Sequence, residues 1–80
     1  MKNESYYEGK ILFKNSEDNS ECTLYINNIN FQTINDIKNR VKEILEEDSK
    51  IYNEFDRIEF YVRERYILRD KKTDWERVEL

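Results

Sequence analysis

The sequence predicts an α+β fold of order ββαββ: a four-stranded, mostly antiparallel sheet with one helix packed on one of its faces. Three observations predict it. Two segments near the N-terminus alternate apolar and polar residues, a central segment has helical periodicity, and the alternation returns after it. We expect one domain over residues 1–80, with residues 1–5 frayed. A chain of this length buries only roughly 60% of its unfolded surface, so we expect modest stability.

The first two strands are predicted from YYEGKILFK and ECTLYI, joined by a turn at NSEDNS, residues 15–20. The odd-numbered residues 7–13 share one strand face, and so do the even-numbered residues 22–26, which is typical of a hairpin. Cys22 is in phase with Leu24 and Ile26, so we expect it to be a small buried side chain. After the Asn27-Asn28 pair the apolar positions change phase, which is what a β-bulge would do.

The helix is predicted from TINDIKNRVKEILEEDSK, residues 33–50. Its apolar stripe consists of Ile34, Ile37, Val41, Ile44 and Leu45. Thr33 followed by Asp36 matches a capping box, and the acid also suits the positive end of the helix dipole. The helix should run from about Ile34 to about Ser49. In the link that follows, Ile51, Tyr52 and Phe55 are expected to cover the core.

The last strands are predicted from RIEFYVRERYILRD, residues 57–70, and WERVEL. One phase of the first segment is apolar except at Glu64, and it consists of Ile58, Phe60, Val62, Tyr66 and Leu68. This pattern indicates either one long strand with a bulge near Glu64 or two strands that bend there. A polar turn at residues 69–74 would let residues 66–70 pair with residues 75–79 in a second hairpin.

The composition excludes several kinds of chemistry. With one cysteine and no histidine, the chain has no internal disulfide, zinc site or Cys-His nucleophile pair. It also has no glycine-rich phosphate loop and no serine in a nucleophile context. We therefore expect a protein that is not an enzyme and binds no cofactor or metal. No apolar stretch approaches the roughly 18 residues that span a bilayer, and MKNESYYEGK lacks a signal region, so a cytoplasmic location without membrane contact is expected.

The acids are concentrated in residues 43–56, where six acids and one base, Lys50, give a local charge of −5 in a chain of net charge −4. We name them the acidic ridge: Glu43, Glu46, Glu47, Asp48, Glu54 and Asp56. Several of these acids crowd the negative end of the helix dipole, at a cost of a few tenths of a kcal/mol each. The ridge is either an ordinary solvated helix face or a surface for a basic partner.

A second candidate surface lies on the sheet. Strand alternation puts Tyr25, Tyr61, Arg63 and Arg65 on the face turned away from the helix. Tyrosine and arginine are enriched in protein-binding hot spots, although exposed tyrosines also suit ordinary cross-strand pairs.

Two resemblances bear on fold and function. The hairpin, TINDIKNRVKEI and DRIEFYVRERYILRD, in that order, resemble the β-grasp arrangement of ubiquitin-like proteins over most of the chain. The chain ends in RVEL without a glycine pair, which argues against attachment through its C-terminus. In composition, a small acidic chain rich in tyrosine and asparagine is similar to phage and mobile-element inhibitors of bacterial defence, anti-CRISPR proteins among them. That resemblance implies an acidic ridge that occupies the DNA-binding groove of a nuclease.

We therefore predict a small non-enzymatic inhibitor of a basic, nucleic-acid-handling protein, which it binds through the acidic ridge and the tyrosine-bearing sheet face. One alternative is a nucleic-acid-binding module that uses the basic patch of Arg63, Arg65, Arg69, Lys71 and Lys72. Nearby acids dilute this patch, and no RNA-recognition signature is present. Another alternative is a subunit of a homo-oligomer, such as a homodimer, formed through the sheet face or an unpaired edge.

Overall fold

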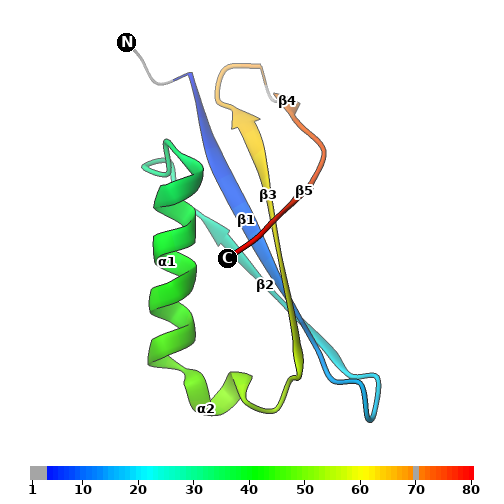
Figure 1. Ribbon diagram of the computed structural model, residues 1–80. Coiled ribbons are helices and arrows are strands. Elements are labelled where there is room, and N and C mark those ends of the chain that lie inside the picture. Colours follow the sequence, from blue (N-terminus) through cyan, green and yellow to red (C-terminus); the bar gives the residue numbers. More distant parts are fainter. Residues whose placement is uncertain (1–3, 70) are drawn as a thin grey trace.

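A computed structural model describes residues 4–69 and 71–80, apart from the side chains of residues 51 and 52. The elements are β1 (Ser5–Lys14), β2 (Glu21–Asn27), α1 (Ile34–Glu47), α2 (Ser49–Tyr52), β3 (Arg57–Tyr66), β4 (Lys71–Lys72) and β5 (Glu76–Val78). The predicted α+β class is confirmed, with α1 on one face of a curled antiparallel sheet (Figure 1).

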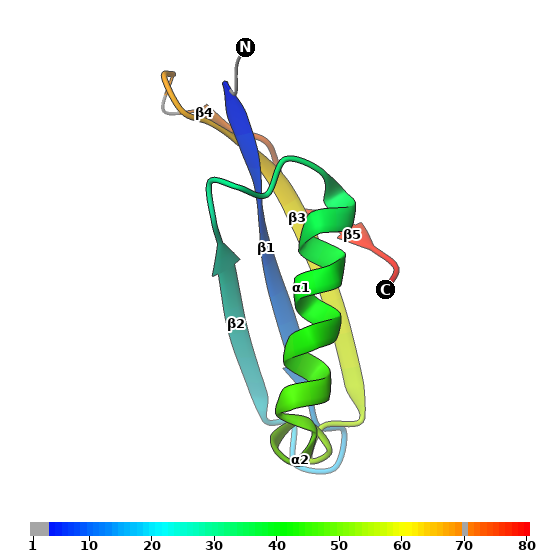
Figure 2. The same cartoon turned by 90° about the vertical axis from the view of Figure 1, so that its left-hand side faces the viewer.

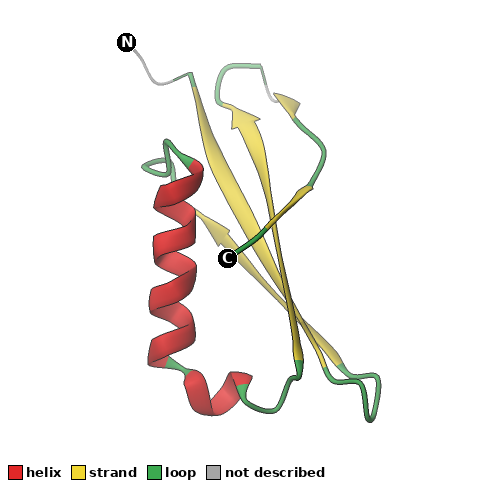
Figure 3. Cartoon of the chain, in the orientation of Figure 1, coloured by secondary structure: helices red, strands yellow, loops and turns green. Residues whose placement is uncertain are grey.

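The sheet has the strand order β2-β1-β3-β4, and β5 also pairs with β3. Both β2 and β3 are antiparallel to β1, so they run in the same direction as each other. The α1 helix connects β2 to β3 and lies along one face of the sheet, as Figure 2 shows. Figure 3 shows the helices on one side of the strand layer.

The core forms where α1 meets the central strands β1 and β3. Its buried side chains are Ile11, Phe13, Ile26, Ile37, Val41, Ile44, Phe60 and Val62. Gly9, the only glycine, lies on β1 below the helix. A Cβ atom there would lie 3.1 Å from both Ile37 Cγ2 and Phe60 Cε1. Glycine at this position therefore lets helix and sheet approach closely, which is what a packed interior requires.

The N-terminus of α1 is capped as predicted. The Asp36 N–H donates to Thr33 Oγ1 at 3.1 Å, and the Thr33 N–H donates to Asp36 Oδ2 at 3.0 Å. The helix begins at Ile34 as expected but ends at Glu47, where the short α2 follows. Its last turn contains no basic residue. Phe55 covers Phe13 with ring centroids 5.7 Å apart. Ile51 and Tyr52, expected to do the same, have side chains outside the described residues.

β3 is one continuous strand, so the predicted bulge or break at Glu64 is wrong. It pairs with β1 in constant register from Arg57 opposite Lys14 to Tyr66 opposite Ser5. Glu64 occupies a position where the neighbouring residues of the same phase are apolar, and its carboxylate accepts two hydrogen bonds there. Ser5 Oγ donates to it at 2.7 Å and the Tyr66 hydroxyl at 3.1 Å. Ser5, expected to be frayed, is the first residue of β1, and residues 1–3 lie outside the described part.

The predicted second hairpin is also wrong in its register. β3 itself pairs with both C-terminal strands: Phe60 lies opposite Val78, and Tyr66 lies opposite Lys71. The pairing of β3 with β1 extends to Tyr66, so the turn begins after that residue. Leu68, which the sequence places in the apolar phase of this strand, falls in the turn instead and is 88% exposed.

β2 ends without the predicted bulge at Asn27-Asn28. A turn follows it, in which the Phe31 N–H donates to the Asn28 carbonyl at 2.9 Å. Cys22 shares a face with Leu24 and Ile26 as predicted, but it is exposed. The prediction of burial is wrong because Cys22 lies near the start of an edge strand, which has a neighbouring strand on one side only.

Candidate partner-binding surfaces

The acidic ridge begins on α1, which carries Glu43, Glu46 and Glu47, and it continues through Asp48 to Glu54 and Asp56 in the link that follows α2. Ile37, Val41 and Ile44 face the core, so Glu43, Glu46 and Glu47 project outward. All six residues of the ridge are exposed. The Arg40 guanidinium lies 3.9 Å from a Glu43 oxygen and 3.8 Å from a Glu47 oxygen. Such exposed ion pairs contribute little to stability. Within the described residues no other cation forms an ion pair with the ridge.

The β1–β2 hairpin loop extends the ridge, which sequence reasoning missed. The Asn15 side-chain amide donates to the Glu54 carbonyl at 2.7 Å, and the Ser16 N–H donates to Asp56 Oδ1 at 3.0 Å. The loop and α2 lie at the same end of the molecule (Figure 1). The loop thereby brings two further exposed acids, Glu17 and Asp18, to that end. We call the ridge together with these two residues the acidic end.

Hydrogen bonds favour the charged form of two carboxylates at the acidic end. Those from Ser16 hold the pKa of Asp56 below its usual value, and those from Ser20 do the same for the pKa of Asp18. A donor hydrogen bond favours the charged form of a carboxylate. Both carboxylates are therefore bound by loop N–H groups in their charged form. The sequence feature that indicates these bonds is the run of Asn, Asp and Ser turn residues in the loop.

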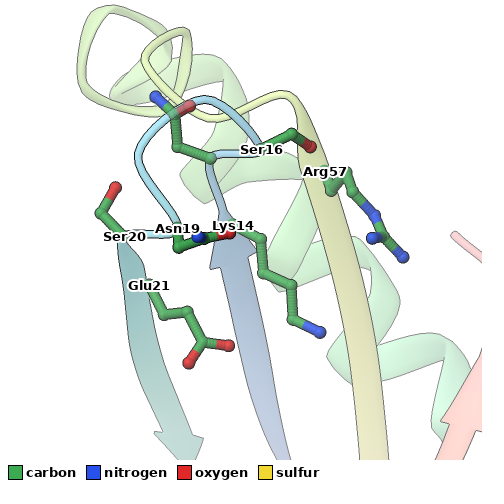
Figure 4. Close-up of a pocket in the computed structure, with 7 residues that line it drawn as sticks. Lys14, Ser16, Asn19, Ser20, Glu21 and Arg57 are labelled. Carbon is green, nitrogen blue, oxygen red and sulfur yellow. The ribbon is translucent and has the colours of Figure 1, made fainter.

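A shallow pocket of about 400 Å³ lies beside the hairpin loop (Figure 4). It is lined by Lys14, Asn15, Ser16, Asn19, Ser20, Glu21 and Arg57. The two cations extend away from the loop, and each lies 3.5 Å from Glu59 Oε2. The backbone N–H groups of Ser16 and Ser20 already donate to aspartate side chains. The pocket therefore does not present these groups to an anionic ligand.

The four predicted sheet residues share the face of the sheet opposite α1, as expected. Lys10 lies between Tyr25 on one side and Tyr61 on the other. Along β1, Glu8 lies opposite Arg63 and Tyr6 lies opposite Arg65. We call this surface the open face. Its composition agrees with the sequence prediction, but its charges are less available than the sequence suggested.

Two carboxylates are buried on the open face beneath the cations that neutralise them. Glu8 is only 5% exposed and accepts a hydrogen bond from Arg63 Nε. Arg65 Nη1 lies 3.7 Å from the other Glu8 oxygen, and Asn27 Nδ2 donates to that oxygen at 3.2 Å. Glu59, 7% exposed, is the second carboxylate. The sequence prediction placed neither of them in a site.

Glu59 and Tyr61 are joined by a short hydrogen bond, in which the Tyr61 hydroxyl donates to Glu59 Oε1 at 2.5 Å. This bond is the largest cause that lowers the pKa of Glu59, and Lys14 and Arg77 add to it. The same bond raises the pKa of Tyr61. The polar end of Tyr61 is thus already occupied by a partner within the chain.

Trp75, which sequence reasoning did not assign to a face, covers the middle of the open face. Its ring centroid lies 4.8 Å from Lys10 Nζ and 4.1 Å from Arg63 Cζ. Lys10 Nζ also lies 5.3 Å from the centroid of the Tyr61 ring. These are cation–π distances. The sequence contained a signal for this placement. Trp75 and Arg77 are both odd-numbered, so strand alternation puts them on the same face, and Arg77 lies opposite Tyr61.

The basic patch of the nucleic-acid alternative is not one surface. Arg63 and Arg65 both contact Glu8 on the open face. Lys72 lies opposite Arg65, whereas Lys71 lies opposite Tyr66 and so belongs to the other face. Arg69 lies in the turn after β3. The structure therefore divides these five residues between two faces and a turn.

The open face and the outer side of α1 point in opposite directions, because the helix covers the other face of the sheet (Figure 2). One flat partner surface cannot contact both the helical acids and Tyr61, so the two halves of the predicted binding surface are separate candidates.

None of the described helices is both long and apolar enough to cross a membrane. Comparison with protein-family models, curated proteins and solved structures found no match to this chain. A functional proposal therefore depends on surface chemistry.

Proposed function

We propose that this protein is a small non-enzymatic inhibitor, encoded by a phage or mobile element, that binds a basic nucleic-acid-handling protein such as a bacterial defence nuclease. Binding takes place in the cytoplasm and through the acidic end. One observation carries the proposal: exposed carboxylates from three segments gather at one end, where Arg40 pairs with only two of them.

The contrast with the rest of the molecule supports this choice of surface. The buried acids Glu8 and Glu59 each have cations beside them. At the acidic end, acids instead occupy the last turn of α1, where the helix dipole disfavours negative charge. Such a field attracts a cationic groove over a distance and accelerates encounter, while it repels a phosphate backbone.

The test compares two triple variants that change net charge equally. Glu46→Gln/Glu47→Gln/Asp48→Asn removes three charges from the acidic end, and its matched control, Asp74→Asn/Glu76→Gln/Glu79→Gln, removes three exposed charges elsewhere. Each protein is used to capture partners from bacterial lysates. A captured nuclease is then purified, and its Kd and DNA cleavage are measured with each variant.

We expect the acidic-end variant to bind about tenfold more weakly and to lose inhibition in proportion, because rim and surface charges act mainly on association. The control should change affinity less than about twofold, and wild-type binding should weaken as salt rises.

Failure to recover a basic partner, equal effects of the two triples, or affinity independent of salt would contradict the proposal. Loss of binding in Tyr25→Ala with full binding in the acidic-end variant would instead assign the interface to the open face.

A further inference from the structure

The outer edge of β2 is unpaired within the described residues. On β1 the odd-numbered residues direct their backbone groups toward β2, since the Tyr7 N–H donates to the Phe31 carbonyl and the Asn15 N–H to the Ser20 carbonyl. The even-numbered residues of β2 lie opposite these odd residues and bond to them. Thr23 and Tyr25 therefore direct their N–H and C=O groups outward.

The two edges of the sheet differ in how they are protected. The edge formed by β4 and β5 consists of strands of 2 and 3 residues that carry Lys71, Lys72 and Arg77. Short strands and lysines are devices that prevent pairing with another chain. β2 has 7 residues, ECTLYIN, with no lysine, proline or bulge, and its only charge is at its first position. Nothing in β2 opposes the addition of another strand.

The side chains along this edge have apolar surface that pairing would cover. Tyr25 is 68% exposed on the open face. On the helix side, Cys22 is exposed and Leu24 is half-buried. An added strand would contact both sets, because side chains of adjacent strands pack in cross-strand pairs.

We propose that two copies of this chain pair antiparallel through β2, with the two-fold axis at Leu24. Leu24 is the middle residue of the strand, so this register pairs all 7 of its residues. It places Thr23 opposite Tyr25 of the second copy, so that the outward N–H and C=O groups of the two residues can hydrogen-bond to each other. It also places Cys22 opposite Ile26 and Glu21 opposite Asn27. No like charges oppose each other, and apolar residues meet on the helix side.

The proposed dimer must form against electrostatic repulsion between its two chains. Each chain carries a charge of −4, so two copies repel one another over long range. Backbone bonds and apolar contact must hold them together, and added salt should strengthen the dimer by screening the repulsion. Salt should therefore strengthen the dimer, whereas it should weaken binding of a basic partner through the acidic end. Because the expected salt effects are opposite, the experiments can reject either proposal without the other.

The first test measures mass by sedimentation equilibrium over a concentration series at low and high salt. We expect the mass to rise from 10.0 kDa toward twice that value, at lower protein concentration in high salt. Thr23→Lys/Tyr25→Lys puts lysines opposite each other in the proposed register and should abolish the dimer. Thr23→Glu/Tyr25→Lys puts opposite charges together at the same two exposed positions and should retain it. Circular dichroism verifies the folding of both variants.

The second test is cross-linking in a Cys22→Ser background. Leu24→Cys places two thiols at the axis, where paired Cα atoms lie about 4.5 Å apart, within the range of a disulfide. Tyr25→Cys is the control, because its two copies are diagonal neighbours about 7–8 Å apart. We expect the disulfide dimer to form in the first variant and not in the second under mild oxidation.

A wild-type chain that stays at 10.0 kDa throughout the concentration series would overturn the proposal. A dimer that survives Thr23→Lys/Tyr25→Lys, or that cross-links no better at residue 24 than at residue 25, would assign dimerisation to another surface and also overturn it.

Discussion

On the open face of the sheet, carboxylates are buried beneath cations, whereas at the acidic end they project into water. Glu8 lies under Arg63 at 5% exposure, while the Glu43 and Glu47 side chains, near Arg40, are 61% and 62% exposed. A charge counted in the sequence is therefore not always a charge that a partner can reach. Arg63 and Arg65 of the open face contact Glu8 within the chain, whereas the acids of α1 remain exposed to solvent.

The largest expected effect is the loss of a buried cation. Arg63→Ala leaves Glu8 without its closest partner, and we expect it to lower the free energy of unfolding by about 2 kcal/mol. Arg40→Ala, which removes the exposed ion pairs of α1, should cost less than about 0.5 kcal/mol. Urea denaturation measures both. Equal losses for the two variants would remove the distinction between the surfaces.

The next effect concerns the aromatic cover of the open face. Trp75→Ala removes a half-buried ring from above Lys10 and Arg63, and we expect a loss of about 1.5 kcal/mol in thermal or urea unfolding. Tyr25→Ala is the matched control on the same face, where the side chain is 68% exposed, and it should change stability little. A larger loss of stability for Tyr25→Ala than for Trp75→Ala would show that Trp75 is not the main aromatic contact of the open face.

A smaller effect depends on pH. The hydrogen bond from Tyr61 holds the pKa of Glu59 below its usual value of 4.5, so the stabilisation from this bond is present above pH 4.5 and is lost as pH falls through the lowered pKa. Tyr61 has a pKa above 10.0, so its contribution is present below that value and is lost as pH rises through the raised pKa. Tyr61→Phe should therefore be less stable than wild type by a constant amount near neutrality.

That difference should shrink in acid below pH 4.5 and in base above pH 10.0, as measured by urea unfolding across the pH range. Tyr25→Phe serves as the control without this hydrogen bond. A difference that stays constant into acid would contradict the assignment of Glu59 as the acceptor.

The smallest expected effect is the change in stability when a glutamate is replaced by glutamine, and its sign should differ between the two surfaces. Glu46→Gln removes an exposed acid from the negative end of α1 and should raise the free energy of unfolding by about 0.3 kcal/mol. Glu59→Gln makes the same chemical change on the open face and should lower stability, because it weakens contacts with Lys14 and Tyr61. If the two variants changed stability in the same direction, the distinction between the exposed acids of α1 and the buried acids of the open face would be wrong.

The features predicted correctly from the sequence are those set by neighbours along the chain. The capping box of Thr33 and Asp36 and the apolar stripe of α1 follow from helical spacing, and the structure contains both. The open-face placement of Tyr61 and Arg63 follows from strand alternation, which holds because β3 has no bulge. Its alternation continues through Glu64 because Ser5 and Tyr66 supply that carboxylate with hydrogen bonds.

The α+β class, the start of α1 and the two faces of each main strand can be predicted from the sequence alone, because these features depend on periodicities within short segments. Which charges remain exposed depends instead on contacts between segments that are distant in the chain. Glu8 and Arg63 are 55 residues apart in the chain, and the hairpin loop reaches Asp56 across 40 residues. Such contacts depend on the register between distant strands and on how loops pack together, and this long-range geometry separates a buried ion pair from an exposed acid.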